Sequence, residues 1–141
     1  MILHIDTTKN DLVAIAVKDK NRLIAETSFN SRRTQAEKLL PAIEKLLKTN
    51  KLKLSNLGGI AVENIGGSFT SLRLGVITAN ALAYALGILV AGSKKSEVRS
   101  KKGSFSVVKP IYDREPEITK KKGAPRNDKA GLWIKLLITV K

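Results

Sequence analysis

The stretch that decides the fold is 57–91, which reads LGGIAVENIGGSFTSLRLGVITANALAYALGILVA. A short apolar run after a glycine pair is typical of a buried strand, and the longer apolar run after the second glycine pair predicts a helix. Ser68 or Thr70 can cap this helix at its start, and Gly87 ends it. The expected elements are a strand, a loop, a helix and a strand at Leu57–Glu63, Asn64–Ser68, Phe69–Leu86 and Ile88–Ala91.

Three further strands are expected before this stretch. They are Ile2–Ile5, Leu12–Lys18 and Arg22–Phe29. The polar residues 6–10 separate the first two, and Asp19-Lys20-Asn21 is a tight-turn signal between the second and third. The beginning of the chain therefore predicts an antiparallel meander of three strands.

A helix is predicted between the third strand and Leu57. Apolar residues recur there with the period of a helix, at Ala36, Leu39, Leu40, Ile43, Leu46 and Leu47. Pro41 lies among them and is expected to bend the helix near its start. The order β-β-β-α-β-α-β is, by analogy, that of the actin-like ATPase and ribonuclease H-like folds, which are α/β folds with a mixed sheet and helices packed on it.

The character of the chain changes after Gly92. We expect residues 1–92 to form one domain and the Lys- and Ser-rich residues 93–103 to be a basic linker. Residues 104–118 are expected to hold a short strand, within Ser104–Tyr112, and a loop. Residues 119–141 are a basic tail with no assigned role.

Composition excludes several classes of site. There is no Cys, which excludes disulfides and thiolate ligands, and the single His4 argues against zinc. Lys plus Arg number 26 and Asp plus Glu 12, so the net charge of +14 favours contact with a polyanion such as RNA. We expect a cytoplasmic protein without membrane contact, because no basic leader precedes the first strand and no apolar run spans a bilayer.

Four segments resemble the TsaB (YeaZ) family, which takes part in making threonylcarbamoyladenosine in tRNA. Gly66-Gly67-Ser68-Phe69-Thr70-Ser71-Leu72-Arg73-Leu74-Gly75 resembles its Gly-Pro-Gly-Ser-Phe-Thr-Gly-Leu-Arg-Ile-Gly motif. Gln35-Ala36-Glu37-Lys38-Leu39-Leu40-Pro41 resembles its His-Ser-Glu-x-Leu-Leu-Pro segment. Met1–Thr7 is similar to its opening strand, and Pro110–Pro116 is similar to its Pro-x-Tyr-x-Arg-Glu-Pro stretch. Most of the family's second domain is missing after Gly92, so the chain resembles a shortened form.

The resemblance implies an actin-like fold without an activity of its own. It implies pairing with a TsaD-like transferase through the two helices, and a TsaE-like ATPase that joins the pair. ATP and Mg²⁺ would act within that complex, and no cofactor is expected on this chain alone. Some family members also form homodimers through the same helices.

Two sets of candidate site residues follow. The helices carry the expected partner contact at Glu37, Leu40, Ile43, Phe69, Leu72, Arg73, Val76 and Asn80. The second helix is apolar almost all round, which predicts that both of its sides are covered. An anion site is expected where the first strand ends and the second helix begins, at Asp6, Thr7, Gly66, Gly67 and Ser68. The same residues can instead form turns and a helix cap.

Two other functions stay open. Asp6 and Glu63 end neighbouring strands, as paired carboxylates do in ribonuclease H-like nucleases that bind two Mg²⁺ ions. Such a nuclease needs a further carboxylate, and Asp113 and Asp128 lie in the expected tail. A structural homodimer without activity is the other alternative.

Overall fold

A computed structural model describes residues 1–9, 11–94, 97–99 and 106–113. Its main element is a five-stranded mixed sheet in the order β3-β2-β1-β4-β5. The antiparallel strands are β1 (Ile2–Lys9), β2 (Leu12–Asp19) and β3 (Arg22–Asn30), and the parallel strands are β4 (Gly59–Val62) and β5 (Leu89–Gly92). The predicted α/β fold is thus confirmed, with strands β1 to β3 slightly longer than expected.

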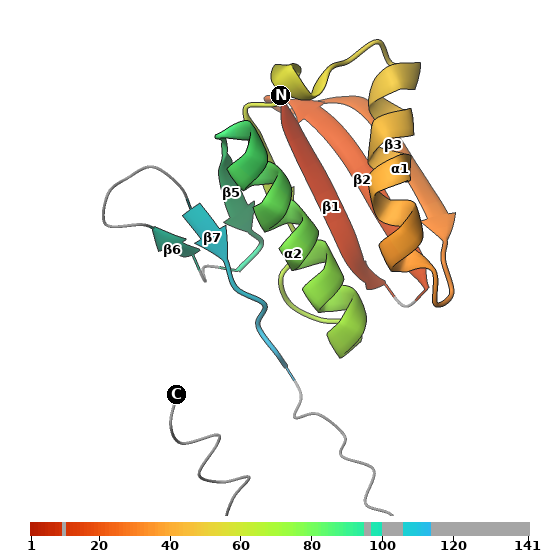
Figure 1. Cartoon of the computed structure of the whole chain (residues 1–141), viewed down its shortest axis with the longest axis vertical. Coiled ribbons are helices and arrows are strands. Elements are labelled where there is room, and N and C mark those ends of the chain that lie inside the picture. Colours follow the sequence, from red (N-terminus) through yellow and green to blue (C-terminus); the bar gives the residue numbers. More distant parts are fainter. Residues whose placement is uncertain (10, 95–96, 100–105, 114–141) are drawn as a thin grey trace, which may run out of the picture.

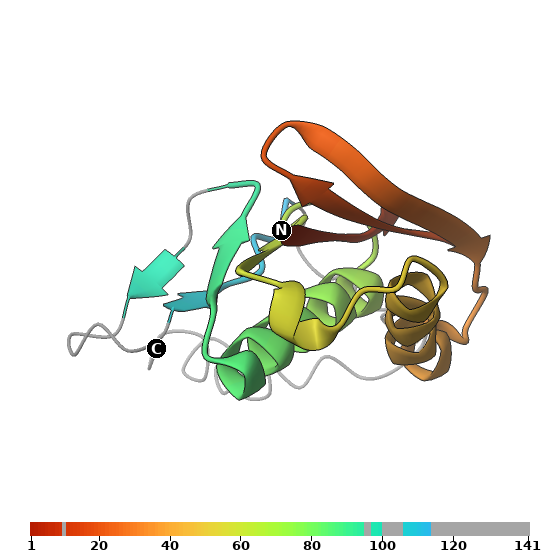
Figure 2. The same cartoon turned by 90° about the horizontal axis from the view of Figure 1, so that it is seen from above.

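Both helices lie on one face of the sheet, as Figures 1 and 2 show. They are α1 (Gln35–Thr49) and α2 (Phe69–Leu86), and a short 3-10 helix, η1 (Leu54–Asn56), leads into β4. Alternate residues of β1 and β2 point toward the helices, so Leu3, Ile5, Val13, Ile15 and Val17 are buried. Full burial of each such side chain contributes about 1.5–3 kcal/mol to folding.

Helix α1 continues through Pro41, with no break in the helix at the expected bend. Pro41 lies on the exposed side of the helix, and the core side is formed by Leu39, Ile43, Leu46 and Leu47. Proline removes one backbone donor, but a carbonyl on the exposed side can accept a hydrogen bond from water instead. The proline is therefore tolerated because of the face on which it lies.

Helix α2 has the length and composition of a membrane span, contrary to the expectation that no run reaches it. In this fold it is a core helix, because Leu72, Val76, Ala79 and Ala83 are buried against the sheet. Ser68 caps its start by accepting a hydrogen bond from the backbone N–H of Ser71, and Gly87 ends it with a positive φ of 67°. The predicted bounds and caps of this helix are confirmed.

Beyond β5, a two-stranded ribbon is formed by β6 (Glu97–Arg99) and β7 (Ser106–Val108). Strand β7 falls within the expected strand Ser104–Tyr112, whereas β6 lies in the stretch 93–103 for which no strand was expected. The Ser106 hydroxyl joins the ribbon to β5, because it accepts from Val90 N–H at 3.0 Å and donates to Val90 O at 3.1 Å. The division into linker and tail stays a prediction, and residues 114–141 lie outside the described residues.

Gly75 allows α2 to lie unusually close to β1. A Cβ atom at this position would collide with the Thr7 side chain, whose hydroxyl donates to Ser71 O at 2.6 Å. Thr7 is fully buried, so neither partner has space to withdraw. The glycine thus sets the distance between the helix and the sheet.

We predict that Gly75→Ala lowers the free energy of unfolding by about 1–3 kcal/mol, as overpacking of a core does. Replacing glycine by alanine inside a helix is normally stabilising. A decrease in the free energy of unfolding therefore identifies the collision with Thr7. Urea unfolding measures it, with Gly58→Ala as a control because a Cβ there meets only Met1 O at 3.8 Å. Equal stability of the two variants would contradict the prediction.

A second prediction concerns His4, the only histidine of the chain. Partial burial lowers the pKa of His4 below its usual value, and the charge of Lys18 lowers it further. The unfolded chain therefore binds a proton more readily than the folded chain. The free energy of unfolding should decrease as pH falls through about 6.5, and it should be insensitive to His4 at higher pH.

Urea unfolding between neutral and mildly acidic pH tests this prediction. His4→Gln should remove the decrease in this range, and Lys18→Gln should reduce it. An unchanged pH dependence in His4→Gln would contradict the assignment.

Candidate functional site

The helices present an apolar surface on the side away from the sheet. Ile77 and Tyr84 on α2 are 64% and 74% exposed, and Leu40 on α1 is 52% exposed. Ala36 and Leu74 line one cavity of about 370 Å³ between the helices, and Leu40 follows Ala36 on the same side of α1. We call the surface formed by Leu40, Ile77 and Tyr84 the outer helical face.

Three of the predicted contact residues do not reach this face. Ile43, Leu72 and Val76 are each only 2% exposed and belong to the core between the helices and the sheet. Their assignment to a contact surface is therefore corrected. The reason is that α2 is apolar on all sides, so its pattern does not distinguish the core side from the outer side. Glu37 and Leu40 are exposed, as a contact surface requires.

Phe69, Arg73 and Asn80 contact the chain's own segment 106–113. The rings of Phe69 and Tyr112 stack with centroids 4.1 Å apart and planes at 3°. Arg73 Nε donates to the Tyr112 hydroxyl at 2.6 Å, and its guanidinium carbon lies 5.1 Å from the Phe69 ring centroid. These contacts fix Tyr112 on the side of α2.

Asn80 binds β7 as a neighbouring strand would. Its side-chain amide donates to Val108 O at 2.8 Å and accepts from Val108 N–H at 2.9 Å. The predicted contact residues Arg73 and Asn80 therefore hold an element of the same chain, and they border the outer helical face.

Asn64 is a fully buried polar residue that the sequence analysis did not single out. Its amide nitrogen donates to Lys94 O and Lys109 O, and its amide oxygen accepts from Lys94 N–H and the Ser93 hydroxyl. Its backbone carbonyl accepts from Ile111 N–H at 2.7 Å. One side chain thus joins the end of β4 to the chain after β5 and to the segment after β7.

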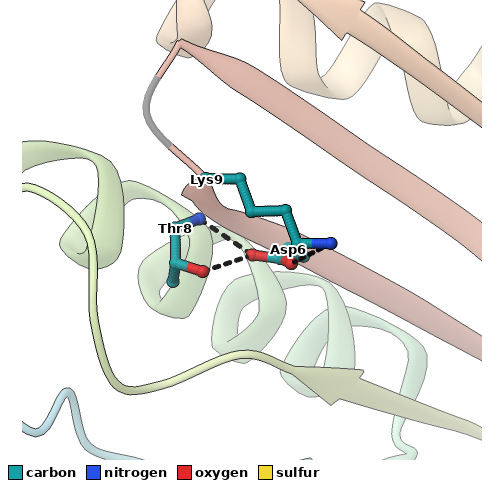
Figure 3. A network of polar contacts seen from close by, with 3 residues as sticks. All are labelled: Asp6, Thr8 and Lys9. Carbon is teal, nitrogen blue, oxygen red and sulfur yellow. Dashed lines mark hydrogen bonds and ion pairs between the residues drawn. The ribbon is translucent and has the colours of Figure 1, made fainter.

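The predicted anion site lies where β1 ends (Figure 3). Both the backbone N–H and the hydroxyl of Thr8 donate to Asp6 Oδ1, at 2.9 and 2.6 Å, and Lys9 Nζ lies 3.8 Å from Asp6 Oδ2. The Thr7 hydroxyl is buried and donates a hydrogen bond to Ser71 O. These residues belong to β1, whose register against β2 shifts between Asp6 and Lys9, so the expected turn begins only after Lys9 and Asp6 is already paired within the strand.

The glycine loop packs directly on this end of β1. Gly66 and Gly67 have positive φ values of 93° and 75°, and a Cβ on Gly67 would lie 2.6 Å from Thr8 O. Ser68 donates its hydroxyl to the Ser71 hydroxyl at 2.8 Å while capping α2. The loop geometry accounts for both glycines, and anion binding there stays a prediction.

Asp6 and Glu63 line the same cavity of about 840 Å³ along the sheet. They follow Ile5 and Val62, which are partners in the parallel pair of β1 and β4, so the two residues stand at corresponding positions on neighbouring strands. Among the described residues, no group of three or more His, Cys, Asp or Glu side chains is arranged to hold a metal ion. Glu26 lines the same cavity, but it does not form a metal-binding group with this pair, as a two-metal nuclease would require.

Comparison with known proteins identifies relatives that are named for a tRNA modification. A family model described as TsaD, tRNA N6-adenosine threonylcarbamoyltransferase, matches residues 22–110. The tRNA threonylcarbamoyladenosine biosynthesis protein TsaB of Bacillus subtilis (strain 168) is 30% identical over 114 residues, which cover 79% of this chain and 49% of that protein. The TsaB protein of Buchnera aphidicola subsp. Schizaphis graminum (strain Sg) is 31% identical over 102 residues, or 72% of this chain and 48% of that protein.

A solved structure agrees with these matches. YeaZ from Pseudomonas aeruginosa superposes with a TM-score of 0.60 at 27% identity, over 66% of this chain and 43% of that one. The chain thus spans about half the length of the curated relatives it matches.

We predict that Asn64→Asp lowers the free energy of unfolding by about 1–3 kcal/mol or more, because a carboxylate facing two carbonyl oxygens cannot donate to them. Thermal unfolding measures the loss. Asn56→Asp is the matched control, because the exposed Asn56 side chain accepts a hydrogen bond from Lys53 N–H through its oxygen, which a carboxylate preserves. A control that is destabilised as much as Asn64→Asp would refute the role of the two donated bonds.

Proposed function

This chain belongs to the family that the TsaD model describes, and within it to the TsaB proteins, and we propose that it serves as a non-catalytic scaffold in the synthesis of threonylcarbamoyladenosine in tRNA. In this proposal it pairs with a TsaD-like transferase through its two helices and acts in the cytoplasm. The transferase carries the chemistry, so ATP and Mg²⁺ act within the complex. A TsaE-like ATPase and tRNA are further proposed partners.

The observation that carries the proposal is the outer helical face. Large apolar side chains normally leave water on folding, yet Ile77, Tyr84 and Leu40 are more than half exposed on two adjacent helices. On α2, Ile77 and Tyr84 lie seven residues apart and therefore point to the same side. Such a stripe fits the helix-to-helix packing of a partner that has a similar pair of helices.

The burial of Ile43, Leu72 and Val76 changes the proposed contact set. The revised set consists of Glu37, Leu40, Ile77 and Tyr84, bordered by Arg73. Removing a buried core residue would unfold the domain, so only exposed positions can test pairing without that ambiguity.

We predict that Ile77→Glu weakens pairing with the TsaD-like transferase of the same source by about tenfold or more, which corresponds to about 1.4 kcal/mol. The reason is that a carboxylate in an apolar interface loses its hydration without gaining a partner. Co-purification followed by size-exclusion chromatography with light scattering measures the complex, and calorimetry measures its affinity.

Leu54→Glu is the matched control, because Leu54 is 43% exposed and lies outside both helices. Its pairing should equal that of the unchanged chain, and circular dichroism should show both variants folded. If the folded Ile77→Glu chain still pairs as tightly as the unchanged chain, the proposed interface is wrong. Light scattering of the chain alone distinguishes the alternative, a homodimer through the same face.

A further inference from the structure

The two helices cover only one face of the sheet, and the opposite face has no covering element among the described residues (Figures 1 and 2). Side chains alternate along each strand, so the residues between the core positions point to this side. They include His4 and Asp6 on β1, Ala14 and Ala16 on β2, and Ala61 on β4. We call this surface the open sheet face.

The open sheet face has the chemistry of a packing surface. Ala14, Ala16 and Ala61 are partly buried, and they form part of the wall of the cavity of about 840 Å³. At its ends, Ile2 and Leu89 are 42% and 62% exposed, and they flank Gly59 on neighbouring strands. Strands that run parallel to one another, as β1, β4 and β5 do here, are usually covered on both faces, so this half of the open sheet face calls for an occupant.

Acidic residues line the same cavity. Asp6, Glu26 and Glu63 come from β1, β3 and the residue after β4. Lys9 lines the cavity as well and lies 3.8 Å from Asp6, so the excess negative charge comes from Glu26 and Glu63. The preferred occupant is therefore apolar along its length and carries positive charges that can meet these carboxylates.

The chain contains one segment with this composition. Residues 132–140 read LWIKLLITV, of which seven are apolar, and Lys129, Lys135 and Lys141 lie within or beside them. The segment is far enough along the chain to reach the open sheet face, because the residues from Asp113 to Leu132 can span up to roughly 60 Å when extended. We propose that residues 129–141 dock on the open sheet face of the same chain, with apolar side chains over Ala14, Ala16 and Ala61 and lysines toward the acidic residues.

The chain provides its own reporter for this contact. Trp133 is the only tryptophan and lies inside the proposed segment, so all tryptophan emission comes from it. In the intact folded chain the emission should be blue-shifted from that of the chain in concentrated urea. Quenching by acrylamide should be several-fold weaker than for N-acetyltryptophanamide in the same buffer. Both properties should be independent of protein concentration.

Ala16→Lys tests the face itself, because Ala16 points away from the core and a lysine there adds charge and bulk under the segment. The variant should remain folded by circular dichroism, and its Trp133 quenching should rise several-fold toward the urea value. Ile77→Lys, on the outer helical face, is the matched control and should leave Trp133 unchanged. If Ala16→Lys fails to fold, the exposed Glu26→Lys takes its place and should raise quenching in the same direction.

The outcomes separate the alternatives. Emission and quenching equal to those of the urea-unfolded chain would overturn the proposal. Protection that is lost on dilution, together with a dimer in light scattering, would assign the face to a second copy and would equally overturn it. Protection that survives both Ala16→Lys and Glu26→Lys would show that the segment packs elsewhere. The proposal does not depend on pairing with a transferase, so the two can fail separately.

Discussion

The close contact between α2 and β1 is the constraint on which the rest of this structure depends. Thr7 is buried beneath the helix and donates to Ser71 O, and Gly75 provides the space that this approach needs. With the helix held this close, Leu72 and Val76 reach the core and Ile77 is turned outward. The same contact withdraws the Thr7 hydroxyl from any ligand. Thr7, which was a candidate for binding an anion, thus helps to determine which side of α2 is exposed.

A second level of organisation rests on this helix. Phe69, Arg73 and Asn80 lie along one flank of α2 and bind Tyr112 and β7, while Asn64 binds the chain on either side of the ribbon. At the edge of the sheet, the Ser106 hydroxyl bonds both backbone groups of Val90 in β5, as a neighbouring strand would do with its backbone. The segment after β5 is thus fixed by polar side chains, by the stacked Tyr112 ring and by Val108, which is buried in the common core. Its position therefore follows from that of α2.

Sequence periodicity was sufficient for β1 to β5, both α-helices and their order, because alternation and the helical period arise from local geometry. It did not predict the short elements η1 and β6. The site was less predictable. Gly75, Ala79 and Ala83 recur every four residues and do mark the buried side of α2, but the large residues around them gave no contrast. The hydrogen bond between Asp6 and Thr8 is local, whereas the hydrogen bond from the Thr7 hydroxyl to Ser71 O spans 64 residues of sequence. Asn64 and Ser106 bind backbone atoms of distant segments, and no sequence pattern marks such partners.

The outer helical face and the open sheet face differ in shape as well as in position. On the open sheet face, alanines at Ala14, Ala16 and Ala61 make a hollow, which large side chains from another segment can fill. On the outer helical face, Ile77 and Tyr84 protrude and need a groove in the partner. A hollow beside acidic residues and a protruding apolar stripe cannot complement each other within one copy, because they lie on opposite sides of the domain. In the two proposals each surface has its own occupant, so occupation of one would leave the other free to bind.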